Sequence, residues 1–143
     1  IPVTIVGFDL CLGDSVLTKE DMEMLMNSRK EEAVFSVKCN RLLAEYNLAA
    51  HNQYFVDLPD AVAMAVALWD DIAIEKKACY AHVCLKEEAA YGQVIFNDGS
   101  KLAIQEGFGE HAPNVEVCTK LNNALYKKRL LSLLMEENTC YTV

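Results

Sequence analysis

One carboxylate, that of Asp60, occupies a position at which a protein could bind a metal ion or a sugar hydroxyl. Asp60 follows Leu58 and Pro59 at the predicted start of a helix, directly after a polar and aromatic stretch at residues 47–55. The helix dipole and free backbone N–H groups stabilise a carboxylate in a first turn, so an ordinary helix start also explains Asp60. The functional interpretation is a metal or sugar-hydroxyl ligand at the mouth of a cleft. A hard cation such as Ca²⁺ takes about six to eight oxygens, so one carboxylate leaves both interpretations open.

The other acidic and imidazole side chains favour surface or structural roles. The acidic pairs are Asp70-Asp71, Glu87-Glu88 and Glu136-Glu137. Adjacent side chains point apart in helices and strands, so we expect these pairs to be solvated. The three histidines lack the spacing of zinc ligands, and they are His51, His82 and His111. The sequence contains no nucleophile elbow, phosphate loop or dinucleotide fingerprint.

Composition narrows the class of protein. The chain has a net charge of -8, which argues against a nucleic-acid partner and against anionic membranes. The longest apolar run, residues 61–69, is less than half of the roughly twenty residues that span a bilayer, so it predicts a buried core helix. Six cysteines without a Cys-x-x-Cys pair predict reduced, mostly buried thiols in a cytoplasmic protein. The 143 residues suit one domain, 1–143.

The first half of the chain predicts one strand and three helices. Residues 2–8 are typical of a buried strand. Thr18 and Asp21 suggest a capping box, followed by a short helix with its inner face on Met22, Leu25 and Met26. A second helix is expected over residues 31–46, with one apolar stripe formed by Phe35, Cys39, Leu42, Leu43 and Tyr46. After a loop at 47–55, the third helix starts near Pro59 and is expected to be buried on all sides.

The second half predicts mainly strands. Strands are expected at 78–85, 93–96 and 115–119, with a turn at 97–99, a short extended segment at 102–105 and a loop at 107–113. The final helix is expected at 123–137. This order predicts an α/β fold with a mixed sheet and flanking helices.

Five segments, in order over essentially the whole chain, carry a family resemblance. They are residues 2–10 (PVTIVGFDL), 17–21 (LTKED), 56–65 (VDLPDAVAMA), 91–94 (YGQV) and 113–117 (PNVEV). Together they resemble the C-terminal half of the inosine-uridine preferring nucleoside hydrolase family, whose fold is Rossmann-like. Position 1 is not Met and the chain opens in a strand-like run, so we expect a fragment of a longer protein.

The resemblance implies a calcium-dependent enzyme that hydrolyses ribonucleosides to ribose and a free base. In the family, Ca²⁺ binds the catalytic water and the ribose hydroxyls. By resemblance, Asp60 matches the C-terminal aspartate that binds both Ca²⁺ and ribose. A bound metal lowers the pKa of water, and the sugar passes through an oxocarbenium-like state. The implied cofactor is therefore Ca²⁺ in the intact parent, and the implied partner is a nucleoside.

Two departures from the family pattern affect activity. The N-terminal aspartate cluster and the central ribose-binding Asn and Glu positions are not in this sequence, so we expect the chain alone to be inactive. Pro59 replaces the usual His before the ligand aspartate, and Pro cannot donate a proton to a leaving base. Base departure is then assisted by another residue, or the parent has altered specificity or little activity. For the first alternative we expect His51 or Tyr54, in the preceding loop, to face the base.

Three hypotheses follow. The first is a nucleoside N-ribohydrolase, seen as its C-terminal portion; the second is a non-catalytic binding or interaction module that keeps the fold, which Pro59 favours; the third is an unrelated α/β binding domain. Either version of the hydrolase fold should expose apolar surface or an unpaired sheet edge. We therefore expect a homo-oligomer or association with the missing N-terminal half. The preferred base is left open.

Overall fold

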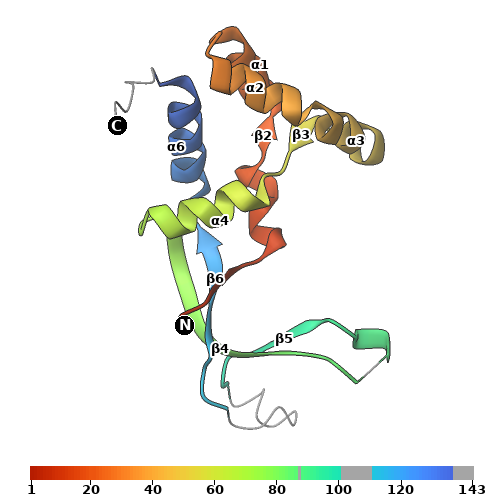
Figure 1. The fold of residues 1–143 in the computed structure, drawn as a ribbon, viewed down its shortest axis with the longest axis vertical. Coiled ribbons are helices and arrows are strands. Elements are labelled where there is room, and N and C mark those ends of the chain that lie inside the picture. Colours follow the sequence, from red (N-terminus) through yellow and green to blue (C-terminus); the bar gives the residue numbers. More distant parts are fainter. Residues whose placement is uncertain (87, 101–110, 137–143) are drawn as a thin grey trace. The chain divides into compact units, whose positions relative to one another are not determined.

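In the computed structural model, residues 1–86, 88–100 and 111–136 are described, and they divide into two units (Figure 1). The first unit joins Ile1–Gly7 to Ala73–Leu121, and the second joins Phe8–Ile72 to the chain from Asn122 onward. Two such units can belong to one domain, so the expectation of a single domain over 1–143 stays a prediction.

The first unit is a four-stranded mixed sheet of order β1-β6-β4-β5. Its strands are β1 (Thr4–Val6), β4 (Ala73–Val83), β5 (Val94–Asn97) and β6 (Val115–Leu121), and a short 3₁₀ helix, η3, covers Glu88–Ala90. β1 and β6 are parallel, whereas β4 is antiparallel to both β5 and β6. The predicted mixed sheet is confirmed, and β4 and β5 form its hairpin (Figure 1).

The sheet differs from expectation at its first strand. β1 covers only three residues and lies at one end of the strand order, so Val3 remains exposed and Phe8 already starts a 3₁₀ helix. The prediction of a fully buried strand over 2–8 is therefore wrong. The turn at 97–99 is confirmed, because Gly99 has a φ of +71° and donates its N–H to Asn97 Oδ1 at 2.8 Å. The predicted segment 102–105 and most of the loop 107–113 lie outside the described residues.

The second unit is mainly helical. Its elements are η1 (Phe8–Cys11), η2 (Gly13–Ser15), β2 (Leu17–Thr18), α1 (Lys19–Asn27), α2 (Glu31–Cys39), α3 (Arg41–His51), β3 (Phe55–Val56), α4 (Pro59–Leu68) and α6 (Asn123–Met135). β2 and β3 pair antiparallel. The final helix is confirmed as far as Met135, and Glu137 lies beyond the described residues. Among those residues, no helix is long and apolar enough to span a bilayer.

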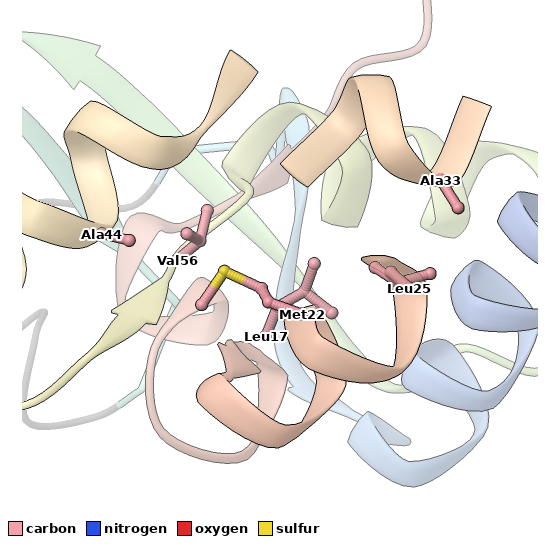
Figure 2. Close-up of a cluster of buried hydrophobic side chains, with 6 residues drawn as sticks. All are labelled: Leu17, Met22, Leu25, Ala33, Ala44 and Val56. Atoms are coloured by element: carbon pink, nitrogen blue, oxygen red, sulfur yellow. The ribbon is translucent and has the colours of Figure 1, made fainter. Parts of the chain in front are cut away.

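A small apolar core holds the second unit together (Figure 2). Its buried members come from β2, α1, α2, α3 and β3, and they are Leu17, Met22, Leu25, Ala33, Ala44 and Val56. Leu25 of α1 lies near Ala33 of α2 (Figure 2). Leucines of α6 pack against this core, so the chain after residue 121 completes it. Met26, predicted to face inward, is exposed instead.

The capping box predicted for α1 is confirmed. Thr18 Oγ1 accepts the N–H of Asp21 at 3.3 Å, and Asp21 Oδ2 accepts the N–H of Thr18 at 2.8 Å. The same Oδ2 lies 2.6 Å from Lys127 Nζ on α6. Burial opposes the ionisation of Asp21, but the hydrogen bonds from Lys127 and Thr18 outweigh it and lower the pKa of the carboxyl group. Asp21 therefore both starts α1 and ties it to α6.

The helix predicted over 31–46 is two helices, and its stripe is wrong. The chain breaks at Asn40, which ends α2, begins α3 and donates its side-chain amide to Ser36 O at 2.9 Å. Asn side chains compete for backbone groups in this way, and they interrupt helices. The large apolar side chains of the predicted stripe are mostly exposed, and the buried positions are Ala33, Ala44 and Asn47. The predicted loop 47–55 is also shorter, because α3 continues to His51.

Helix α4 begins at Pro59 as predicted but is not buried on all sides. Val62, Ala65 and Val66 are buried, whereas Met64 and Leu68 are exposed. Pro59 occupies the first turn, where its missing N–H leaves no intrahelical bond unmade. The exposed apolar side chains of α4 show that an apolar sequence permits burial but does not determine which side chains are buried.

We predict that Leu25→Ala lowers the free energy of unfolding by about 2–5 kcal/mol, because it leaves a cavity beneath α1. Leu25 is 0% exposed, whereas Leu42 is 72% exposed. The matched variant Leu42→Ala should change stability by no more than about 0.5 kcal/mol. Urea unfolding followed by circular dichroism measures both, and equal losses would contradict this description of the core.

We also predict that Asp21→Asn costs about 1–2 kcal/mol at pH 7, because it weakens charge-assisted hydrogen bonds. Folding lowers the pKa of Asp21 below its unfolded value of 3.8. Its stabilising contribution is therefore present above that value and is lost as the pH falls through the folded pKa. Unfolding measured from pH 7 to pH 3 should show the gap to wild type closing below about pH 4. Asp14→Asn, at an exposed position, should show no such convergence.

Candidate functional site

Asp60 lies in the first turn of α4, one residue after Pro59. Leu58 begins the helix without a side-chain cap, and its carbonyl accepts the N–H of Val62 at 3.0 Å. The carboxylate of Asp60 is exposed. The sequence therefore predicted correctly where this residue sits in its helix, and in this chain the side chain is open to further contacts.

Three carboxylates, one in η1 and two near the start of α4, raise the pKa of one buried thiol. Cys11 is 1% exposed and ends η1, which packs against α4. Burial raises the pKa of the Cys11 thiol, and the negative charges of Asp57, Asp9 and Asp60 raise it further. This thiol therefore stays neutral at physiological pH. Sequence reasoning singled out Asp60 alone, because Asp9 is distant in sequence and Asp57, although only three residues away, precedes the helix start.

Tyr126 of α6 lies near the same thiol. It is 1% exposed, and burial, followed by the field of Cys11, raises the pKa of its phenol to about 12. Its hydroxyl has no hydrogen-bond partner within the described part of the chain. An unpaired buried hydroxyl costs about 1–3 kcal/mol. Sequence reasoning missed Tyr126, since it is the one aromatic residue in a leucine-rich helix and carries no motif.

These carboxylates supply the hard oxygen atoms that Ca²⁺ prefers. Within residues 1–86, 88–100 and 111–136, however, no group of three or more His, Cys, Asp or Glu side chains is arranged to hold a metal ion. The donor chemistry fits calcium, but the described residues do not form a coordination shell by themselves. The assignment of Asp60 as a ligand stays a prediction.

His51 and Tyr54 face different cavities of the second unit. His51 lines a cavity of about 320 Å³, and Tyr54 lines one of about 450 Å³ beside α1. The structure does not bring these two residues together, nor does Asp60 line either cavity. The larger cavity carries the charged Lys19 and Glu23, whereas the smaller one has no Asp, Glu, Lys or Arg in its lining.

The other histidines and the Asp70-Asp71 pair lie in settings that suit structural or surface roles. Tyr80 stacks on His111 with ring centroids 4.2 Å apart and lies 6.0 Å from the ring of His82. Asp71, expected to be only solvated, accepts two hydrogen bonds from Arg129. The hydrogen bond from Arg129 lowers the pKa of Asp71. Both Asp70 and Asp71 are exposed, as expected.

The cysteines mostly follow the prediction of buried thiols. Cys11, Cys79, Cys84 and Cys118 are buried, and Cys39 is exposed. Burial, followed by the charge of Asp98, raises the pKa of Cys79. Cys140 lies outside the described residues.

Comparison with solved structures identifies the fold. The chain is similar to a plant nucleoside hydrolase, with a TM-score of 0.78, 18% identity and coverage of 95% of this chain and 42% of that chain. It is also similar to an inosine-guanosine nucleoside hydrolase, with a TM-score of 0.72, 20% identity and coverage of 96% and 40%. A purine-preferring ribonucleoside hydrolase from Gardnerella vaginalis gives a TM-score of 0.73, 16% identity and coverage of 94% and 40%. The chain thus spans less than half the length of these structures.

Sequence comparison identifies the family. No curated protein matches the chain. The family model for inosine-uridine preferring nucleoside hydrolases, however, matches residues 1–128. The match runs from β1 through the first turns of α6, and it contains Asp60, Cys11 and Tyr126. This chain therefore belongs to the inosine-uridine preferring nucleoside hydrolase family.

Proposed function

We propose that this chain is the C-terminal part of an enzyme that hydrolyses the N-glycosidic bond of ribonucleosides, giving ribose and a free base. The observation that carries the proposal is the position of Asp60 inside the matched family region, exposed in the first turn of α4. An exposed carboxylate at a helix start can accept hydrogen bonds from sugar hydroxyls and can also bind a cation. The three structural relatives are nucleoside hydrolases by name, and two of those names specify purine nucleosides.

Asp60 would contribute to a Ca²⁺ site together with residues beyond this sequence. When bound, the metal would supply an acidified water and a fixed point for the sugar. The carboxylate of Asp60 would orient the ribose by accepting hydrogen bonds from its hydroxyls. Asp9 and Asp57 would add negative potential beside it, since both act on the Cys11 thiol as Asp60 does. Such potential favours the positive charge of an oxocarbenium-like sugar.

The departing base needs a proton or a hydrogen bond from another residue, because Pro59 offers neither. We propose His51 or Tyr54 for this role, each from its own cavity. Exposed apolar side chains of α4, such as Met64 and Leu68, support association with the remainder of the hydrolase fold or with a second copy. A cytoplasmic location belongs to the same proposal.

A second candidate is a non-catalytic module that retains the fold, and Pro59 favours it. Pro removes a side chain that could act as an acid, while it preserves the helix start. The two candidates differ in one measurable property, which is ribose release. A panel of purine and pyrimidine nucleosides, incubated with and without Ca²⁺, separates them.

We predict that the 143-residue chain alone releases no ribose, and that the full-length protein containing it does so only with Ca²⁺. In that protein, Asp60→Asn should lower kcat/KM by at least about 100-fold, because it removes a direct metal and ribose ligand. The matched control, Asp70→Asn, changes an exposed carboxylate near the other end of α4 and should retain activity within about twofold. Absence of ribose release from the full-length protein on every nucleoside would instead support the non-catalytic module.

A further inference from the structure

The cavity of about 450 Å³ beside α1 combines two opposite charges with an apolar floor. Side chains three and four positions apart share one face of a helix, and five of the lining residues recur at that spacing on α1: Lys19, Met22, Glu23, Met26 and Asn27. Val37 of α2 and Tyr54, just before β3, complete the lining. The volume lies within the range of small-ligand sites, about 300–1,000 Å³, so the cavity suits a small molecule.

The apolar floor of this cavity consists of Met22, Met26, Val37 and Tyr54. Met22 is 3% exposed and lies among the buried residues of the core (Figure 2). Val37 and Tyr54 pack against the same core, whereas Met26 is exposed. Methionine side chains are flexible and polarizable, so they adapt to apolar groups of different shape. The floor therefore accepts an apolar group of a ligand without prescribing one shape.

The two charged groups of the lining form a loose ion pair. Lys19 Nζ lies 3.8 Å from Glu23 Oε1, and the two side chains are 63% and 62% exposed. A charge-assisted hydrogen bond between nitrogen and oxygen is shorter, about 2.7–2.9 Å, so these two atoms attract each other without such a bond. An ammonium has three donors, and a carboxylate has several acceptor positions. Both groups therefore keep hydrogen-bonding capacity for a ligand.

Opposite charges this close to each other select against simple ions and uncharged molecules. A cation that approaches Glu23 is repelled by Lys19, and an anion that approaches Lys19 is repelled by Glu23. An uncharged apolar ligand would displace water from both charged groups without replacing the lost hydrogen bonds. A ligand with an ammonium and a carboxylate on the same carbon compensates both groups at once.

We propose that this cavity binds a free α-amino acid with an apolar side chain, a site that goes beyond the proposed hydrolase function. The ligand's carboxylate accepts hydrogen bonds from Lys19 Nζ, and its ammonium donates to the carboxylate of Glu23. Four charges then alternate in sign around a ring, so that every neighbouring pair attracts. The ligand's apolar side chain lies over the floor that Met22, Met26, Val37 and Tyr54 form.

A second ion pair of the same spacing separates the effect of the cavity from that of surface charge. Arg41 Nε of α3 lies 3.4 Å from Glu45 Oε1, four positions along the helix, and the two side chains are 68% and 53% exposed. Neither residue lines the cavity beside α1. The Arg41–Glu45 pair therefore offers matched charges without the apolar floor, and it serves as the control.

The test is an NMR titration of the 143-residue chain, ¹³C-labelled at its methionine methyl groups, with L-phenylalanine. We expect saturable shifts at Met22 and Met26 and none at Met64 of α4. The dissociation constant should lie in the millimolar range, because water competes for both exposed charges. Two analogues each lack one charge: 2-phenylethylamine has no carboxylate, and 3-phenylpropanoate has no ammonium. Each should bind about fivefold more weakly or worse, because one charged hydrogen-bonding group goes unanswered.

Three variants locate the binding charges. Lys19→Gln and Glu23→Gln should each weaken the binding of L-phenylalanine by about fivefold, with hydrogen bonds to charged groups discounted for exposure. The matched control, Glu45→Gln, should leave the dissociation constant unchanged. Exposed ion pairs of this spacing contribute little to stability, so all three variants should remain folded, which circular dichroism checks.

Three results would overturn the inference. The first is the absence of saturable shifts up to the solubility limit of L-phenylalanine. The second is equal binding of L-phenylalanine and either analogue, which would show an apolar site that does not use the charge pair. The third is equal weakening by Glu23→Gln and Glu45→Gln, which would show a general effect of surface charge.

Discussion

The buried side-chain amide of Asn47 fixes the segment on which the candidate site depends. It is 4% exposed, and its Nδ2 donates to Phe55 O at 3.1 Å and to Asp57 Oδ1 at 3.3 Å. Two donors on one nitrogen thus join α3 to β3 and to the start of α4. Leaving such a group unpaired in the core would cost about 1–3 kcal/mol, so the two hydrogen bonds hold Phe55 and Asp57 against α3. The proposed ligand role of Asp60 depends on this placement, because Asp57 lies three residues before it.

The carboxylates beside Cys11 give the site its electrostatic character. Asp9 lies in η1 with Cys11, whereas Asp57 and Asp60 lie about fifty residues later near the start of α4, yet all three raise the pKa of the same buried thiol. The two buried groups themselves, the Cys11 thiol and the Tyr126 phenol, have raised pKa values and are uncharged at physiological pH. The carboxylates therefore create a negative potential that no buried cation of this pair offsets, and such a potential favours a positively charged group.

The sequence predicted the family, the mixed sheet and the features of the fold that are encoded locally. The capping box at Thr18 and the helix start at Pro59 depend on neighbouring residues, so the local sequence pattern was sufficient to predict both. Burial was harder to predict, because it depends on what packs against each face. The large side chains of residues 35–46 suggested an inner stripe, but α2 and α3 contact the core through Ala33 and Ala44, and Asn40 divides the helices. Small residues permit close packing and leave no hydrophobic signal.

Of the candidate site, the sequence predicted only the features that depend on neighbouring residues in the chain. The helix position of Asp60 is of this kind, whereas its effect on Cys11, and the effect of Cys11 on Tyr126, arise from tertiary packing. His51 and Tyr54 were grouped because they are close in sequence. In the extended chain that leads into β3, however, alternate side chains point to the same face. Gln53 and Phe55 therefore line one cavity, whereas Tyr54 lines the other. The proposed reaction still needs a group that assists the departing base, and Pro59 has no acidic proton to give. Because the two candidates line separate cavities, the fold allows at most one of His51 and Tyr54 to serve from a given cavity.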